Sequence, residues 1–186
     1  LTHKGNIGTE SRAAVAGGIT SFMEMPNTVP YALTQELLED KYQIASQSSI
    51  ANYSFFMGAS NDNIEEVLKT NDNTVCGIKI FMGSSTGNML VDNEQTLRSL
   101  FSRVDMLIAA HCEDEKTVRN NLELAIEKYG ENIPVNLHPI IRSDEACYLS
   151  TDLAFKLARE YQTRFHVLHI STAIETKLMS NAPLNS

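Results

Sequence analysis

The chain has 186 residues, of which 42% are hydrophobic and 20% are charged, a composition typical of a soluble globular protein with one core. Its formal charge of −8 and its lack of clustered lysine and arginine residues exclude nucleic acid as the expected partner. Its three cysteines are too few and too scattered for a disulfide framework or a cysteine zinc site, which favours a reducing, cytoplasmic compartment.

Helix and strand patterns alternate along the whole sequence. In chain order we expect a helix over residues 9–16, a strand over 19–25, a helix over 34–46, a strand over 52–58, a short helix over 61–68, a strand over 76–82, a helix over 93–103, a strand over 106–111, helices over 116–129 and 143–161, a strand over 164–170, and a last helix beginning near Ser171. This alternation indicates a parallel sheet covered on both faces, either doubly wound or part of a (β/α)8 barrel.

No apolar run approaches the length of a membrane-spanning helix, and no charged-then-apolar leader opens the chain. We therefore expect a small-molecule substrate and no membrane partner, with a homodimer as one possible assembly. The first residue, Leu1, is not an initiator methionine, so we expect the sequence to be an internal piece of a longer protein.

One lysine interrupts the apolar strand expected over residues 76–82. Since side chains alternate along a strand, Ile78 and Ile80 share one face and Lys79 lies on the other. A buried cation is costly unless it is paired, neutralised or chemically changed. Three readings follow: an ion pair with a carboxylate, a nucleophilic lysine that forms a Schiff base, or an amine carboxylated by carbon dioxide that bridges two divalent metal ions.

Polar side chains occur near the carboxyl ends of four expected strands, where parallel sheets build their functional sites. They are Asn27, Lys79, His111 and His169. Strand parity predicts that His111 and His169 both face the interior, whereas His166 faces the other way and is expected to be structural. Because neutral imidazole is a common metal ligand, two such histidines beside an interior lysine indicate a metal centre.

Five short runs occur in a fixed order along the chain: Gly-Gly-Ile-Thr at residues 17–20, Met-Pro-Asn-Thr-Val-Pro at 25–30, Gly-Ile-Lys-Ile-Phe at 77–81, Ala-His-Cys-Glu at 110–113 and His-Val-Leu-His-Ile-Ser at 166–171. Together they resemble the dihydroorotases, a family of the amidohydrolase superfamily, over nearly the whole sequence. A single run such as Ala-His-x-Glu is weakly specific, but the ordered set is strong. The run Met-Pro-Asn-Thr favours dihydroorotases over hydantoinase, dihydropyrimidinase and allantoinase relatives.

The resemblance implies a (β/α)8 barrel with two divalent metal ions, usually zinc, that interconverts N-carbamoyl-L-aspartate and L-dihydroorotate in pyrimidine synthesis. Lys79 matches the lysine that carries carbon dioxide as a carbamate and bridges the two metals. His111 and His169 match two histidines that bind one of the metals, and Asn27 matches an asparagine that contacts the substrate carboxylate. Two metal ions would activate a water molecule near neutral pH and polarise the amide carbonyl under attack.

Two parts of the family's centre have no counterpart in this sequence, so the resemblance implies that residues 1–186 form a single incomplete barrel domain without its first and last strands. A His-x-His strand is expected before Leu1. The aspartate that acts as general base is expected beyond Ser186, so no catalytic residue is assigned here. We expect the isolated segment to be inactive and poorly stable, since an open barrel leaves two strand edges unpaired.

Three other functions are compatible with these residues. One is a related hydrolase of a hydantoin, a dihydropyrimidine or allantoin, which a substrate panel would distinguish. Another is a metal-free lyase that uses Lys79 as a Schiff base, and the third is a non-catalytic homologue retained for assembly.

Several further residues are weaker candidates for a site. Glu113, Arg142 and Glu145 are expected to form exposed salt bridges. Cys112 is expected to be a packed thiol that points away from the centre, and His3 to lie on the surface. The glycine-containing stretch 83–88 is expected to be a turn rather than an anion site.

Overall fold

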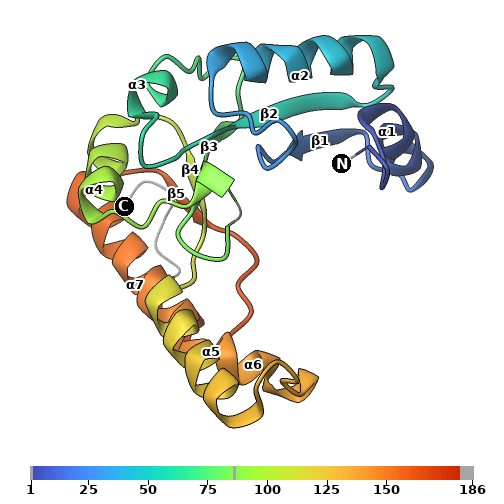
Figure 1. Cartoon of the computed structure of the whole chain (residues 1–186). Helices are drawn as coiled ribbons and strands as arrows, with labels where there is room; N and C mark the ends of the chain where they lie inside the picture. The colour runs from blue at the N-terminus through green and yellow to red at the C-terminus, as the bar shows by residue number, and fades with distance from the viewer. Residues whose placement is uncertain (1, 86, 181–186) are drawn as a thin grey trace.

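A computed structural model describes residues 2–85 and 87–180, and its central feature is a parallel sheet of five strands (Figure 1). The strands are β1 (Ser21–Glu24), β2 (Asn52–Gly58), β3 (Gly77–Phe81), β4 (Ile108–His111) and β5 (Phe165–Val167). Their order in space is their order in the sequence, β1-β2-β3-β4-β5. A doubly wound sheet would reverse its strand order at a switch point, so this order identifies a segment of a (β/α)8 barrel.

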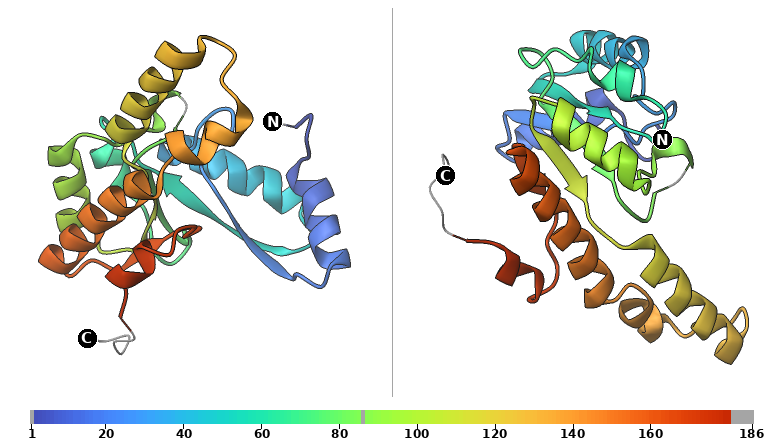
Figure 2. Two further views of the ribbon diagram at one scale, coloured as in Figure 1. Left: turned by 90° about the horizontal axis from the view of Figure 1, so that it is seen from below. Right: turned by 90° about the vertical axis from the view of Figure 1, so that its left-hand side faces the viewer.

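Helices connect the strands. The α-helices are α1 (Ile7–Ala16), α2 (Gln35–Ser48), α3 (Ile64–Val67), α4 (Glu94–Arg103), α5 (Glu115–Tyr129), α6 (His138–Ile141) and α7 (Asp144–Tyr161), and the short 3₁₀ segments are η1 (Gly87–Met89), η2 (Val135–Leu137) and η3 (Glu175–Leu178). Figure 2 shows α5 projecting away from the sheet, with α6 and the start of α7 beside it. None of the helices in the described residues is long and apolar enough to cross a membrane.

Polar side chains cap the helices close to the starts that the sequence predicts. Thr34 accepts a backbone hydrogen bond at the start of α2, and Asn93 and Ser143 do the same for α4 and α7. Helix α1 begins earlier than predicted because Asn6 and Thr9 form a capping box ahead of it. Strand β2 matches its predicted range at both ends.

The strand register divides the sheet into two faces. Lys79 lies level with Gly58 of β2 and Ala109 of β4, and Ala109 lies level with His166 of β5. The opposite face packs against the helices in a core that includes Phe55, Met57, Ile78, Ile80, Ile108 and Ala110 from the strands and Leu38, Leu97, Leu100, Phe101 and Leu157 from the helices. Burial of that apolar face stabilises the sheet, and it directs Lys79 to the inner side of the barrel segment, as predicted.

The last elements differ from the sequence prediction. The strand expected over 164–170 ends at Val167, and an α-helix near Ser171 is replaced by η3. Glu175 explains the second difference, because its buried carboxylate accepts hydrogen bonds of 2.7 Å from both Thr151 of α7 and Thr172. These bonds hold the segment against α7 instead of letting it extend as a regular helix.

A buried ion pair fastens α2 to the end of β1. Lys41 Nζ lies 2.8 Å from Glu24 Oε2 and donates a hydrogen bond of 2.9 Å to the Met25 carbonyl. The Lys41 side chain is 9% exposed, and burial lowers its pKa although Glu24 opposes the shift. Removal of the ammonium would leave the Glu24 carboxylate without its cation in a partly desolvated position.

We expect Lys41→Met to lower the free energy of unfolding by about 1–3 kcal/mol, because the lost hydrogen bonds leave the polar atoms of β1 unpaired. The measurement is chemical denaturation of the intact protein. Lys156→Met is the matched control, since Lys156 pairs with Asp152 on α7 while 68% exposed, and it should change stability by less than about 0.5 kcal/mol. Equal effects of the two substitutions would contradict this account.

Candidate metal centre

A lysine and two histidines lie near the carboxyl ends of β3, β4 and β5. Lys79 lies within β3, His111 is the last residue of β4, and His169 follows β5. The β3–β4 register pairs Phe81 with His111, which places His111 on the same inner face as Lys79. The Phe81 ring lies beside both, with its centroid 3.6 Å from Lys79 Nζ and 6.3 Å from the His111 ring.

The environment of Lys79 removes one of the three readings of this residue. Its side chain is buried, with the whole residue only 2% exposed, and Nζ donates a hydrogen bond of 2.6 Å to the Ile80 carbonyl. Among residues 2–85 and 87–180, no carboxylate forms an ion pair with it. Burial lowers the pKa of Lys79 to about 7. A large share of the amine is therefore neutral near neutral pH, the form that can react with an electrophile.

The two histidines are close enough to share one metal ion. Nδ1 of His111 lies 3.2 Å from Nε2 of His169. Two nitrogens that bind one zinc ion at about 2.0–2.1 Å in tetrahedral geometry lie about 3.4 Å apart. Burial lowers the pKa of His111, and His169 and Lys79 lower it further although Glu113 opposes them. Neutral imidazole, the form that binds metals, is therefore favoured.

His169 reaches the site by a route that strand parity does not predict. The register pairs His166 with Ala109 and so gives His166, which is exposed, the inner face of β5, while Val167 packs on the core face. A regular strand would send His169 to the core face with Val167. Instead the strand ends, and His169 adopts a left-handed φ of +39° with its ring beside that of His111. The prediction from strand parity that β5 turns His169 inward and His166 outward is therefore wrong, although His169 does lie beside His111.

Glu113 is a buried part of the site, whereas the sequence predicts an exposed salt bridge. Its side chain is only 3% exposed. Arg142 Nε donates to Oε1 at 2.7 Å, while Arg142 Nη2 and the Ser84 hydroxyl both donate to Oε2. Burial alone would raise the pKa of Glu113, but these hydrogen bonds outweigh burial and lower its pKa. The Arg142 side chain is 38% exposed and Glu145 is exposed, so the predicted exposure of these two residues is confirmed, but the partner of Arg142 is the buried Glu113.

A cavity of about 400 Å³ opens beside the histidines, and its lining includes His111, His169, Glu113, Arg142 and Glu175. This combination of ring nitrogens, carboxylates and a guanidinium can orient a polar ligand.

The other sequence candidates differ in how they lie relative to this cavity. Asn27, the expected substrate contact, is exposed just after β1 and does not line this cavity, so its role stays a prediction. His3 lies in an exposed turn, as expected. Cys112 is buried in the core, as expected, but it also lines the cavity beside the histidines. Of the stretch 83–88, Thr86 lies outside the described residues, and Ser84 bonds to Glu113.

The side chains near His111 and His169 limit which groups could bind a metal ion here. In the part of the chain that the structure describes, no three His, Cys, Asp or Glu side chains gather closely enough to hold a metal ion. A centre in this part of the chain would therefore need Lys79 beside His111 and His169. A cationic ammonium cannot bind a metal, whereas a carbamate on the same nitrogen supplies two anionic oxygens.

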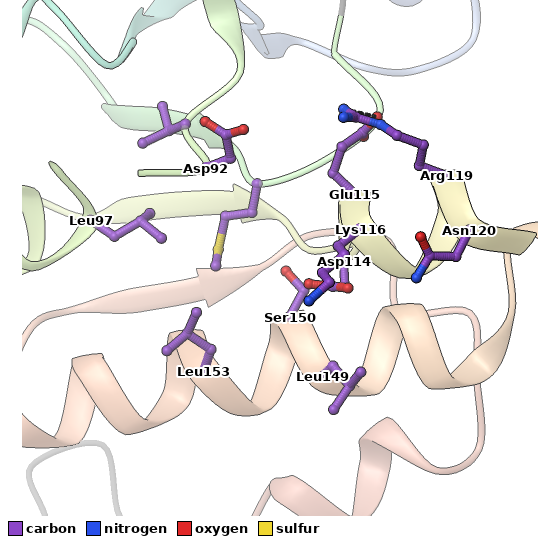
Figure 3. A pocket seen from close by; sticks show the side chains of 12 residues that line it. Asp92, Leu97, Asp114, Glu115, Lys116, Arg119, Asn120, Leu149, Ser150 and Leu153 are labelled. Atoms are coloured by element: carbon purple, nitrogen blue, oxygen red, sulfur yellow. Dashed lines mark ion pairs between the residues drawn. The ribbon is translucent and has the colours of Figure 1, made fainter. Parts of the chain in front are cut away.

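A second cavity of about 390 Å³ lies between α5 and α7 (Figure 3). Figure 3 shows Leu149, Ser150 and Leu153 of α7 on one side and Glu115, Lys116, Arg119 and Asn120 of α5 on another. The cavity shares no lining residue with the cavity beside the histidines. It therefore contributes nothing to the candidate metal centre.

Sequence comparison finds relatives that match nearly the whole chain. A dihydroorotase of Methanosphaera stadtmanae is 27% identical over 98% of the chain, and one of Methanosarcina acetivorans is 31% identical over 92%. An allantoinase of Streptomyces avermitilis is 30% identical over 97%. The chain spans only 36% to 41% of the length of these relatives. No family model matches the chain.

Solved structures share the fold. The L-hydantoinase of Arthrobacter aurescens superposes with a TM-score of 0.86 over 93% of this chain and 39% of its own, at 23% identity. The dihydropyrimidinase of Brevibacillus agri gives a TM-score of 0.77 over 94% of this chain and 38% of its own, at 21% identity. These matches confirm the α/β fold and the partial barrel that the sequence predicts.

Proposed function

Because this chain is homologous to the cyclic amidohydrolases, we propose that it carries part of the metal centre of an enzyme that opens and closes a cyclic amide ring. The observation that carries the proposal is the pairing of His111 and His169, with nitrogens 3.2 Å apart, on the same side of the sheet as the buried Lys79. Within the described residues, no carboxylate forms an ion pair with Lys79. In this proposal Lys79, His111 and His169 are metal ligands, and the metal is zinc.

Lys79 becomes a ligand by reaction with carbon dioxide. The neutral amine attacks the carbon, an N–C bond forms, and one proton leaves the nitrogen for solvent. The product is a carbamate with two oxygens, and it replaces a buried cation by an anion that two divalent ions can neutralise. The lowered pKa of about 7 supports this step, since only the unprotonated amine reacts.

Two divalent ions, when bound, lower the pKa of a water molecule and polarise a carbonyl group. The side chains of this chain would hold and orient that centre. His111 and His169 would present ring nitrogens to one ion, and the cavity beside them leaves room for a ligand. Asn27, at the end of β1, would contact a substrate carboxylate.

For the substrate we propose L-dihydroorotate, interconverted with N-carbamoyl-L-aspartate in pyrimidine synthesis in the cytoplasm. The run Met-Pro-Asn-Thr at residues 25–28 supports this choice, and so do the dihydroorotases among the relatives. The allantoinase relative is equally similar, so allantoin, hydantoins and dihydropyrimidines form the competing substrate class. The cytoplasmic assignment is supported by the free thiols of Cys76, Cys112 and Cys147.

The test is a substrate panel with the intact protein and a zinc assay on the same sample. We expect turnover of dihydroorotate at least about tenfold above that of allantoin or hydantoin, with loss of activity on chelation and recovery on addition of zinc. Preferred turnover of allantoin would replace the substrate assignment but keep the reaction class. A metal-free protein that borohydride traps on a carbonyl substrate would instead identify Lys79 as a Schiff-base lysine.

A further inference from the structure

His111 has two ring nitrogens, and each faces a different partner. Nδ1 lies 3.2 Å from His169, on the side where the proposed metal ion would sit. Nε2 is buried and makes no hydrogen bond to any residue that the structure describes, and the atom beside it is Glu113 Oε2 at 3.4 Å. A buried ring nitrogen without a partner is costly, so the carboxylate is the group that can satisfy it.

A neutral imidazole carries one proton, and the position of that proton decides which nitrogen can bind a metal. With the proton on Nε2, directed at the carboxylate of Glu113, the lone pair of Nδ1 points toward His169. With the proton on Nδ1, this nitrogen has no lone pair to offer a metal ion. Nε2 then directs its own lone pair at the Glu113 carboxylate. In the second arrangement two hydrogen-bond acceptors, Nε2 of His111 and the carboxylate of Glu113, face each other in a buried position, which is unfavourable.

We propose that Glu113 is a positioning residue that holds His111 in its Nε2–H form, so that Nδ1 is the metal-binding nitrogen. This inference rests on the metal centre proposed above and adds to it a residue that acts through His111 instead of binding the metal itself. Carboxylates in this position raise ligand affinity because they fix both the tautomer and the ring orientation.

The carboxylate of Glu113 is itself held from two directions. Arg142, at the junction of α6 and α7, binds both oxygens, and Ser84, in the loop after β3, binds Oε2. The loop approaches closely at Gly83, where an added Cβ would lie 2.2 Å from the Glu113 carbonyl oxygen. Backbone contact and three hydrogen bonds from two residues therefore fix the carboxylate, so that His111 must adapt to it.

The first test uses Glu113→Gln, which keeps the shape of the side chain and removes its charge. An amide in place of Oε2 can donate as well as accept, so it no longer selects the Nε2–H form. In metal-free protein, at a pH where both imidazoles are neutral, ¹⁵N NMR of ring-labelled histidine should show His111 shifting from the Nε2–H form toward a mixture. Zinc affinity, measured by competition with a chelator, should fall about 10- to 100-fold.

The control is Glu24→Gln, which also weakens an ion pair of a carboxylate but lies at β1, where the partner is Lys41. It should lower stability and leave both the His111 tautomer and the zinc affinity unchanged. If Glu113→Gln fails to fold, Glu113→Asp tests the same inference. The shorter side chain keeps the negative charge that pairs with Arg142 but moves the carboxylate away from His111. The Asp variant should show the same two changes in smaller degree.

The outcomes separate this inference from the proposed function. An unchanged tautomer together with zinc affinity within about twofold of the wild type would overturn the positioning role while leaving the metal centre intact. A wild-type protein that binds no zinc would overturn the proposed function, and the tautomer measured in metal-free protein would still decide whether Glu113 orients His111. A wild-type His111 found in its Nδ1–H form would overturn the inference directly.

Discussion

Lys79→Ala is expected to lower ring-opening activity by at least about 1,000-fold, which corresponds to about 4 kcal/mol of lost transition-state stabilisation. The substitution removes the Lys79 amine, which is the group that β3 contributes to the proposed centre. The two imidazoles would then face the metal ions without the bridging anion, so we expect the zinc content of the purified protein to fall as well. Steady-state turnover and metal analysis of the same preparation measure the two effects.

Restored activity distinguishes a carbamate from a simple structural lysine. Alanine leaves a cavity where the lysine stem lay, so acetate or propionate could place a carboxylate near the former carbamate position. We expect partial recovery that saturates with carboxylate concentration in Lys79→Ala but none in Lys79→Met, whose side chain fills the space. Full activity of either variant without added carboxylate would exclude Lys79 from the centre.

Gly83→Ala is expected to produce the largest loss of stability, about 2–4 kcal/mol. Its new Cβ would lie 2.2 Å from the Glu113 carbonyl oxygen and 2.9 Å from the carbonyl carbon. Both are backbone atoms two residues after the end of β4, and they cannot move aside without disturbing the segment that holds His111. Chemical denaturation of the intact protein measures the loss, and zinc affinity should fall with it.

Gly17→Ala is the matched control for this substitution. Gly17 caps α1 with a φ of −84°, and an added Cβ would meet nothing closer than 3.4 Å. We expect its stability to stay within about 0.5 kcal/mol of the wild type. A Gly83→Ala variant as stable as Gly17→Ala would show that the loop after β3 is not packed against β4 as described.

Local signals in the sequence predict most of the fold. Thr34, Asn93 and Ser143 cap helices through side-chain bonds to residues a few positions later, so neighbouring sequence contains the information. The inward direction of Lys79 follows from alternation with Ile78 and Ile80, since β3 is regular throughout.

Features that depend on distant contacts could not be predicted in the same way. The burial of Glu113 depends on Arg142 and Ser84, each 29 residues away in the sequence. The placement of His169 depends on where β5 stops and on a left-handed backbone conformation, which no alternation pattern of apolar residues encodes. The sequence therefore identifies the right residue types at the strand ends but not the contacts that orient them.

The sequential strand order has a consequence for how the protein is made. From β2 to β5, each strand pairs with the strand that precedes it in the chain, so a newly synthesised strand finds that neighbour already present. β5 joins last among the described strands, and His169 arrives with it. Binding of a metal ion between His111 and His169 would therefore follow assembly of the sheet. It would stabilise strands that are already paired and would not nucleate their pairing.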